Sequence, residues 1–129
     1  RAVGMILELK VEGIGNEACA IVKRTGFPGP LIYASFLMPE LQRVRQTDPD
    51  AKIMVLQHRR LPPDPVADVV ALDASHVGLH FSTVTPMLLQ TYHNLGRQVF
   101  VYTVNESQDI QRMRNLGVDG IISDFPDRI

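Results

Sequence analysis

Six apolar, strand-like segments recur at a steady spacing and constrain the fold of this chain more than any other feature. They begin near positions 5, 31, 52, 76, 98 and 120, about 21 to 26 residues apart, with a helix-forming segment between successive strands. Strands that alternate with helices in this way indicate successive βα units and a parallel sheet. We expect the crossovers to be right-handed.

The first predicted strand, Gly4–Val11, carries charged residues inside an apolar run. Because alternate residues of a strand face the same way, Glu8 and Lys10 share one face with Ile6, while the opposite face is apolar. A carboxylate in this position should not be buried alone. A salt bridge between Glu8 and Lys10 is therefore the structural explanation that the spacing alone favours.

Capping residues and prolines delimit the predicted helices. Asn16 is expected to cap a helix that ends at Gly26. Pro39 suits the first turn of the next helix, which must end before Pro49. Thr85-Pro86 predicts the start of a later helix.

The C-terminal stretch contains a complete strand–helix–strand unit. A β-branched strand, Val99–Val104, ends at Asn105, and a second short strand follows the helix at Gly120–Ser123. Asn105 and Gln108 stand in capping-box spacing, so Asn105 is predicted to be the helix N-cap. Asp124 is predicted to cap the turn that follows, although it could also line a site there.

Composition excludes several classes of function. The 129 residues suffice for one domain with a core, and 45% of them are hydrophobic. A net charge of -1 gives no reason to expect nucleic acid or an anionic membrane as a partner. No apolar run reaches the ~18–20 residues of a membrane span. The single cysteine, Cys19, excludes an intrachain disulfide and is expected to be buried.

Three motifs in sequence order carry a resemblance to a known family. VYTVN, a helix and LGVDGIISDFPD together resemble the C-terminal signature of the glycerophosphodiester phosphodiesterases. MILELK resembles that family's Glu-x-Lys strand, and Ser35-Phe36 matches the Ser-Phe that ends its next strand. The resemblance implies an α/β fold, a TIM-type (β/α)8 barrel of roughly 250 residues. Residues 1–129 would be a single partial domain with about six of its eight strands.

The resemblance also implies a chemistry, metal-dependent hydrolysis of glycerophosphodiesters to glycerol 3-phosphate and an alcohol. Glu8 matches the metal-binding glutamate, and hard oxygen ligands suit Mg²⁺ or Ca²⁺. Lys10 would hold the phosphate. Phe36, Tyr102 (where the family usually has Trp) and Asn105 would contact the substrate, although strand parity puts Tyr102 and Asn105 on opposite faces.

The catalytic histidines of the resembling family belong to motifs that do not precede Gly4 here. The chain alone is therefore expected to be inactive and to need a missing N-terminal part of the barrel or a second copy. The histidines present, at positions 58, 76, 80 and 93, are predicted to be ordinary polar or surface residues. Two alternatives stay open, a non-catalytic half-barrel that binds or assembles, and another phosphate-handling barrel. The alcohol and the metal identity also stay open.

Overall fold

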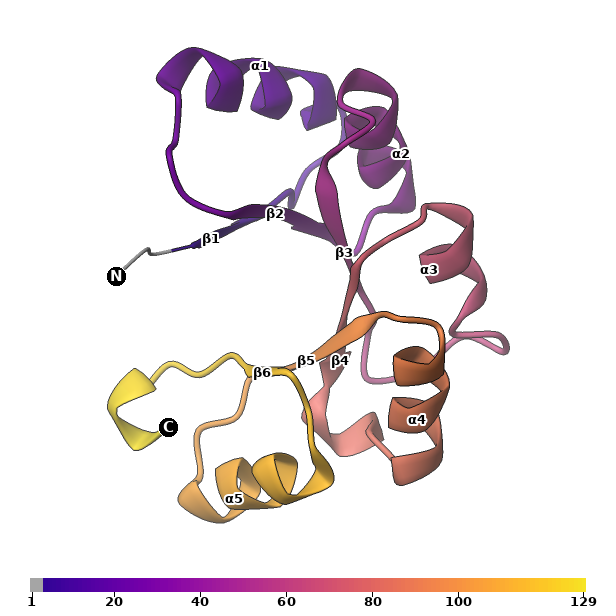
Figure 1. Ribbon diagram of the computed structural model, residues 1–129, viewed down its shortest axis with the longest axis vertical. Helices are drawn as coiled ribbons and strands as arrows, with labels where there is room; N and C mark the ends of the chain where they lie inside the picture. The colour runs from indigo at the N-terminus through magenta and orange to yellow at the C-terminus, as the bar shows by residue number, and fades with distance from the viewer. Residues whose placement is uncertain (1–3) are drawn as a thin grey trace.

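The computed structural model describes residues 4–129, and its strands begin at all six predicted positions (Figure 1). The strands are β1 (Met5–Glu8), β2 (Leu31–Ser35), β3 (Lys52–Leu56), β4 (His76–His80), β5 (Gln98–Tyr102) and β6 (Gly120–Ile121). The helices are α1 (Gly15–Thr25), α2 (Met38–Thr47), α3 (Ala67–Ala71), α4 (Pro86–Asn94) and α5 (Ser107–Leu116), with short 3₁₀ helices η1 (Phe81–Thr83) and η2 (Pro126–Arg128).

The strands form one parallel sheet in the order β1-β2-β3-β4-β5-β6. Figure 1 shows the sheet curving into an arc, with the helices outside it and with the start of β1 and the C-terminal end of the chain on the open side. Consecutive parallel neighbours with helical crossovers are the arrangement of a TIM-type barrel. The predicted α/β class and the six parallel strands are confirmed.

Both faces of the sheet are packed with apolar side chains. On the outer face, strand residues such as Val55, Val77 and Val101 are fully buried and belong to a cluster with helix residues such as Leu41 and Tyr92. The inner face carries a smaller apolar cluster. Its buried residues are Ala34, Met54 and Leu56, and the partly buried Ile32, Phe36 and Phe100 pack against them. Burial on two faces explains why the strands read as nearly continuous hydrophobic runs.

β1 is shorter than predicted. It ends at Glu8, because β2 ends at Ser35 and the Ser35 hydroxyl donates a hydrogen bond of 2.6 Å to the Leu9 carbonyl. Lys10 therefore lies in the β1–α1 loop and not on a strand. Val11, predicted on the apolar face, is 57% exposed in the same loop.

Some predicted helix ends are confirmed. Gly26 ends α1 in the left-handed conformation with a φ of 65°, as predicted, and Gly117 ends α5 in the same conformation with a φ of 92°. Thr85 caps α4, where its side chain accepts a hydrogen bond of 3.1 Å from the Leu88 N–H. Pro39 lies in the first turn of α2, as predicted.

The predicted cap of α1 is wrong. Ile14 occupies the N-cap position without a side-chain hydrogen bond, and the Asn16 side chain instead accepts a hydrogen bond from Thr47 Oγ1. The physical reason is that the Glu40 carboxylate, from α2, accepts hydrogen bonds from the Gly13 and Gly15 N–H groups. Glu40, which is distant in sequence, therefore accepts hydrogen bonds at the start of α1 that a local capping side chain would otherwise accept.

The predicted capping box of α5 is also wrong. Glu106 is the N-cap residue, and the Asn105 side chain is engaged with Ser123 and Asp124 after β6. The turn before Pro126 is capped by Ser123, whose hydroxyl accepts a hydrogen bond from the Phe125 N–H. Asp124 does not make the predicted turn cap, because its carboxylate accepts a hydrogen bond from the Asn105 amide.

Cys19 is buried, as predicted, with 7% of its surface exposed. Within residues 4–129, no helix has the length and apolar character needed to cross a bilayer.

Candidate functional site

The C-terminal ends of the strands bring several predicted residues to one edge of the sheet. Phe36 follows β2, and Tyr102 is the last residue of β5. Their rings lie 5.9 Å apart in an edge-to-face arrangement, although they are 66 positions apart in the sequence. In parallel sheets of this kind, sites form at the carboxyl ends of the strands.

Two histidines complete a cluster of rings at this edge. His58 stacks on Phe36 with ring centroids 4.3 Å apart, and His80 lies 5.7 Å from Tyr102. We call Phe36, His58, His80 and Tyr102 the aromatic cluster. The sequence predicts both histidines to be ordinary polar residues, and the sequence signal for a site role of His58 is its place directly after a strand. The register that carries His80 beside Tyr102 becomes visible only in the paired sheet.

Hydrogen bonds fix the orientation of two cluster members. The Tyr102 hydroxyl donates a hydrogen bond to the main-chain carbonyl of Gln57. His80 Nδ1 lies 2.7 Å from Ser82 Oγ. Burial, and then the positive charge of Arg59, lower the pKa of His80, so the neutral imidazole is favoured.

Glu8 and Lys10 are both exposed at the end of β1. None of the salt bridges formed among residues 4–129 involves either side chain, so the predicted Glu8–Lys10 pair is absent there. Burial raises the pKa of Tyr102, and the Glu8 carboxylate raises it further. The charge of Glu8 therefore acts on one member of the aromatic cluster, Tyr102.

Glu8 has the chemistry of a metal ligand but not a complete coordination set. A hard cation such as Mg²⁺ or Ca²⁺ binds carboxylate, carbonyl and water oxygens, six or more in number. In the part of the chain that the structure describes, no group of three or more His, Cys, Asp or Glu residues could hold a metal ion. Among these residues, Glu8 alone could therefore supply only one of the oxygen ligands that such a cation needs.

Asn105 lies in the loop after β5, and its hydrogen bonds go to the segment after β6. Its side-chain carbonyl accepts hydrogen bonds from the Asp124 N–H at 3.0 Å and from Ser123 Oγ at 3.1 Å. Its side-chain NH₂ donates to Asp124 Oδ2 at 3.1 Å. β5 ends at Tyr102, before Asn105, so strand parity no longer separates the two residues. Asn105 links the loops that follow β5 and β6.

The other two histidines lie elsewhere. His76 is buried at the start of β4, where its ring meets the Phe100 ring edge to face and Nδ1 lies 2.6 Å from Ser75 Oγ. His93, on α4, lies 2.7 Å from an Asp119 carboxylate oxygen. Neither belongs to the aromatic cluster, and His76 is buried rather than at the surface.

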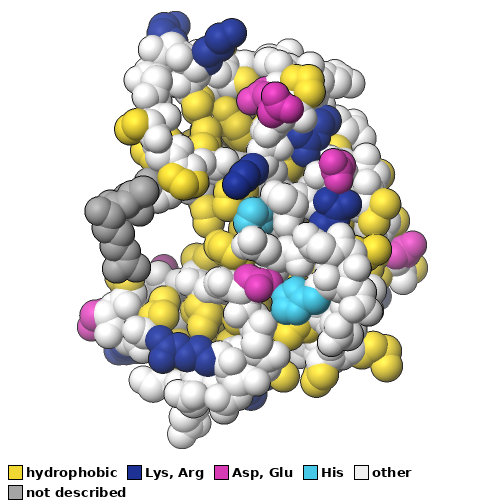
Figure 2. Space-filling model, in the orientation of Figure 1, with side chains coloured by type: hydrophobic (Ala, Val, Ile, Leu, Met, Phe, Trp, Pro, Cys, Tyr) yellow, Lys and Arg dark blue, Asp and Glu magenta, His cyan; other side chains and the backbone are white. Residues whose placement is uncertain are grey.

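A hollow beside the aromatic cluster extends the site toward the β3–α3 loop. It is lined by Phe36, Met38, Val55, Leu56, Gln57, His58, Arg60, Pro62 and Asp68. Figure 2 shows histidine side chains on this view of the molecule, near Lys or Arg and Asp or Glu side chains and close to hydrophobic side chains that border the opening of the arc. The edge therefore combines apolar surface with groups of both charges.

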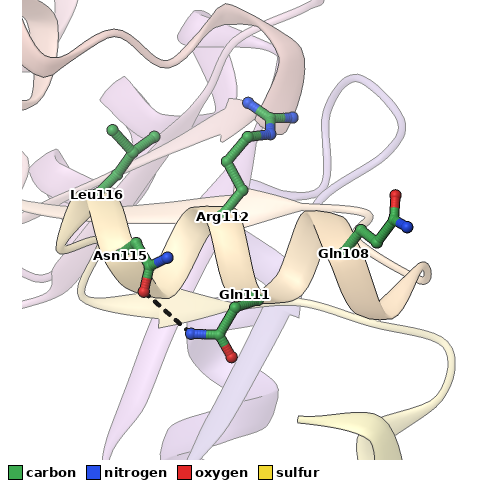
Figure 3. Close-up of a pocket in the computed structure, with 5 residues that line it drawn as sticks. All are labelled: Gln108, Gln111, Arg112, Asn115 and Leu116. Carbon is green, nitrogen blue, oxygen red and sulfur yellow. Dashed lines mark hydrogen bonds between the residues drawn. The ribbon is translucent and has the colours of Figure 1, made fainter.

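A second hollow lies on the outer surface of α5 (Figure 3). Its lining consists of Gln108, Gln111, Arg112, Asn115 and Leu116, and the Gln111 amide donates a hydrogen bond to Asn115 Oδ1. All five residues belong to one helix, and none is a carboxylate or a histidine. We therefore do not consider it a candidate site for hydrolysis.

The sequence of the chain was compared with protein families and with known proteins, and it matches one family over most of its length. The profile of the glycerophosphoryl diester phosphodiesterase family matches residues 6–128. A glycerophosphodiester phosphodiesterase from Caldanaerobacter subterraneus subsp. tengcongensis is 28% identical over 117 residues, covering 91% of this chain and 48% of the relative.

Solved structures of phosphodiesterase-type proteins have the same fold as this chain. A Silicibacter pomeroyi protein, described provisionally as a glycerophosphoryl diester phosphodiesterase, superposes with a TM-score of 0.84 and 31% identity, covering 95% of this chain and 47% of its own. An Oleispira antarctica phosphodiesterase in complex with the product sn-glycerol-3-phosphate has a TM-score of 0.86 at 24% identity, covering 98% of this chain and 53% of its own. The chain spans about half the length of these proteins.

Proposed function

Because this chain belongs to the glycerophosphoryl diester phosphodiesterase family, we propose that it supplies part of an active site that hydrolyses glycerophosphodiesters. The products would be glycerol 3-phosphate and an alcohol. The chain spans about half the length of its relatives. The activity is therefore proposed for a barrel completed by further strands, from additional residues or from a second copy, and not for these 129 residues alone.

One observation carries the proposal. Glu8 and Lys10 are exposed together at the C-terminal end of β1, and no salt bridge among residues 4–129 neutralises either charge. Exposed charges without a salt bridge are common on protein surfaces, so it is the place of both groups at the C-terminal end of a strand, where barrel active sites form, that supports a binding role. The electrostatic influence of Glu8 on Tyr102 supports a common site with the aromatic cluster.

Glu8 would hold a divalent cation, Mg²⁺ or Ca²⁺, as one of several oxygen ligands. When bound, such a cation neutralises negative charge on the phosphoryl oxygens. The contribution of Glu8 is to fix the position of the cation at the end of β1. Because Glu8 forms no salt bridge with any of residues 4–129, it could do so without first breaking one there.

Lys10 would donate to the phosphate. An ammonium group on a flexible stem brings three hydrogen-bond donors and a positive charge to the anion. Lys10 is exposed in the β1–α1 loop, two residues beyond Glu8. Metal and phosphate would thus be bound by neighbouring positions of one segment.

Phe36 and Tyr102 would contact the glycerol or alcohol part of the substrate. Their edge-to-face packing leaves a mixed apolar and polar surface at the site. The hydrogen bond from the Tyr102 hydroxyl to Gln57 sets the ring orientation. Asn105 would form the border of the site, beside Asp124.

A product-binding measurement tests the proposal. We would titrate the chain with glycerol 3-phosphate in the presence of Mg²⁺ and follow amide NMR signals. We expect shifts at residues 8–10, 36 and 102, and at least about tenfold weaker binding in Lys10→Gln, because a charge-assisted hydrogen bond is lost. Lys52→Gln is the matched control, because Lys52 is exposed at the start of β3, the opposite end of the sheet.

Two outcomes would contradict the proposal. One is the absence of shifts at residues 8–10. The other is equal binding by Lys10→Gln and Lys52→Gln. Either would favour the alternative that this chain is a non-catalytic half-barrel or handles another phosphate compound.

A further inference from the structure

A hydrogen bond from Ser35, the last residue of β2, restrains Leu9, the first residue of the β1–α1 loop. The Ser35 hydroxyl donates a hydrogen bond of 2.6 Å to the Leu9 carbonyl and accepts one of 2.9 Å from the Leu37 N–H. Ser35 has no exposed surface. Since the Leu9 carbonyl belongs to the peptide group shared with Lys10, the hydroxyl fixes the backbone directly before the Lys10 side chain.

Hydrogen bonds to Glu40, in α2, restrain the other end of the same loop. The two oxygens of the Glu40 carboxylate accept separate hydrogen bonds, from the Gly13 N–H at 3.0 Å and from the Gly15 N–H at 2.9 Å. Glu40 is only 1% exposed, and Arg43 contacts it at 3.2 Å. The N–H of Gly13 holds the pKa of this carboxyl below its usual range, and the contacts of Gly15 and Arg43 act in the same direction.

Close packing accompanies the second attachment. A Cβ added to Gly15 would lie 2.9 Å from the Glu40 main-chain oxygen and 3.3 Å from its Oε1. Glycine at this position therefore permits the start of α1 to approach the carboxylate. A larger residue would push the loop away from α2.

Between the two attachments, Lys10, Val11 and Glu12 are exposed. Ser35 and Glu40 are five positions apart in one β2–α2 junction, so a single junction holds both ends of the segment that presents Lys10. A side chain presented from a restrained backbone loses less conformational freedom when it binds a ligand. The attachments reach the loop from a different βα unit and do not involve the Lys10 side chain.

We propose that Ser35 and Glu40 are positioning residues, which hold the β1–α1 loop so that Lys10 meets the phosphate of the substrate. The inference rests on the proposed function, because it takes Lys10 as the phosphate-binding group. Neither residue touches the substrate. Both act through the main chain of Leu9–Gly15.

Glu40→Gln tests the second attachment with little change in volume. The amide offers one acceptor oxygen, and its NH₂ faces the other main-chain N–H, so one hydrogen bond is lost. We expect amide hydrogen exchange at Gly13 and Gly15 to accelerate by about tenfold or more. We also expect the dissociation constant for glycerol 3-phosphate to rise by roughly three- to tenfold, while exchange in α4 stays unchanged.

Glu17→Gln is the control, because it removes one exposed carboxylate from the first turn of α1. Ser35→Ala is the second variant, since it removes only the hydroxyl that binds the Leu9 carbonyl. We expect weaker glycerol 3-phosphate binding in Ser35→Ala and wild-type binding in Glu17→Gln. The binding measurements are made well below the melting temperature of each variant.

The outcomes separate this inference from the function on which it rests. If Lys10→Gln abolishes binding while Glu40→Gln and Ser35→Ala bind like wild type, the positioning role is wrong and the proposed function stands. If Lys10→Gln binds like wild type, the proposed function fails and the positioning role fails with it. Faster loop exchange without weaker binding would show that the attachments are merely structural, and would also overturn the inference.

Discussion

The side-chain carbonyl of Asn105 accepts a hydrogen bond of 3.0 Å from the main-chain N–H of Asp124. This contact joins the loop after β5 to the segment after β6. The Asn105 main-chain carbonyl also accepts a hydrogen bond of 2.9 Å from Arg128. One asparagine thereby anchors the segment after β6 to the loop after β5.

Replacing Asn105 with alanine should destabilise the protein. The change removes both acceptor and donor from a half-buried network and leaves Asp124 and Ser123 without their partner. We expect a loss of about 1–3 kcal/mol in the free energy of unfolding, measured by urea denaturation. Asn115→Ala is the control, because the exposed Asn115 side chain accepts only a bond from Gln111 within α5 and should change stability by less than about 0.5 kcal/mol. Equal losses would contradict the anchoring role.

The Glu40 contacts predict an acid-dependent loss of stability. The hydrogen bonds of Gly13 and Gly15 lower the pKa of the carboxyl in the folded state, so its ionised form stabilises the fold above the range of an unfolded glutamate, about pH 4.3. That contribution disappears as the pH falls through the lowered pKa. We expect the difference in melting temperature between wild type and Glu40→Gln to be largest near neutral pH and to shrink below about pH 4. A difference that stays constant would show that the carboxylate charge is not involved.

His76 predicts a second pH dependence, in a higher range. Burial lowers the pKa of its imidazole, and the charge of Lys52 acts in the same direction. The neutral form is favoured in the folded state, so stability is retained above the unfolded value of about 6.5 and declines as the pH falls below it. His76→Leu should therefore have a shallower decline in melting temperature from pH 7 to pH 5 than wild type. Parallel declines would mean that other groups cause the loss.

The strands could be predicted from the sequence because their signal is local. Periodic apolar runs set where each strand begins, and all six positions agree with the structure. The helix-cap predictions were wrong where the hydrogen-bond partner belongs to a segment that is distant in sequence. Glu40 is 25 positions from Gly15, and Asp124 is 19 positions from Asn105, so nothing near Asn16 or Asn105 revealed the competing contact.

The site was predicted only as separate residues. The family motifs point to Glu8, Lys10, Phe36 and Tyr102, but the distances between these residues depend on strand register and on the curvature of the sheet. His58 and His80 join the cluster because paired strands align their ends. No spacing rule connects residues 58 and 102 along the chain, so the aromatic cluster could not be inferred before the sheet was assembled.

The chain alone should not hydrolyse glycerophosphodiesters at a substantial rate. Glu8 has no group of further metal-binding side chains around it within residues 4–129, and phosphodiester hydrolysis needs both charge neutralisation and proton transfer. Incubation with glycerophosphocholine and Mg²⁺ or Ca²⁺ checks this. Robust turnover that is lost in Glu8→Ala would show that the complete catalytic set lies within these residues.

The most direct test of the central claim is the response of the Glu8 segment to a paramagnetic divalent cation. Mn²⁺ binds oxygen ligands like those of Mg²⁺ and broadens the NMR signals of nearby amides, even when binding is weak. We predict that Mn²⁺ broadens the amides of residues 8–10 in the wild-type chain and that Glu8→Gln abolishes this effect. No broadening at residues 8–10, or the same broadening in Glu8→Gln, would contradict the assignment of Glu8 as the metal-binding carboxylate.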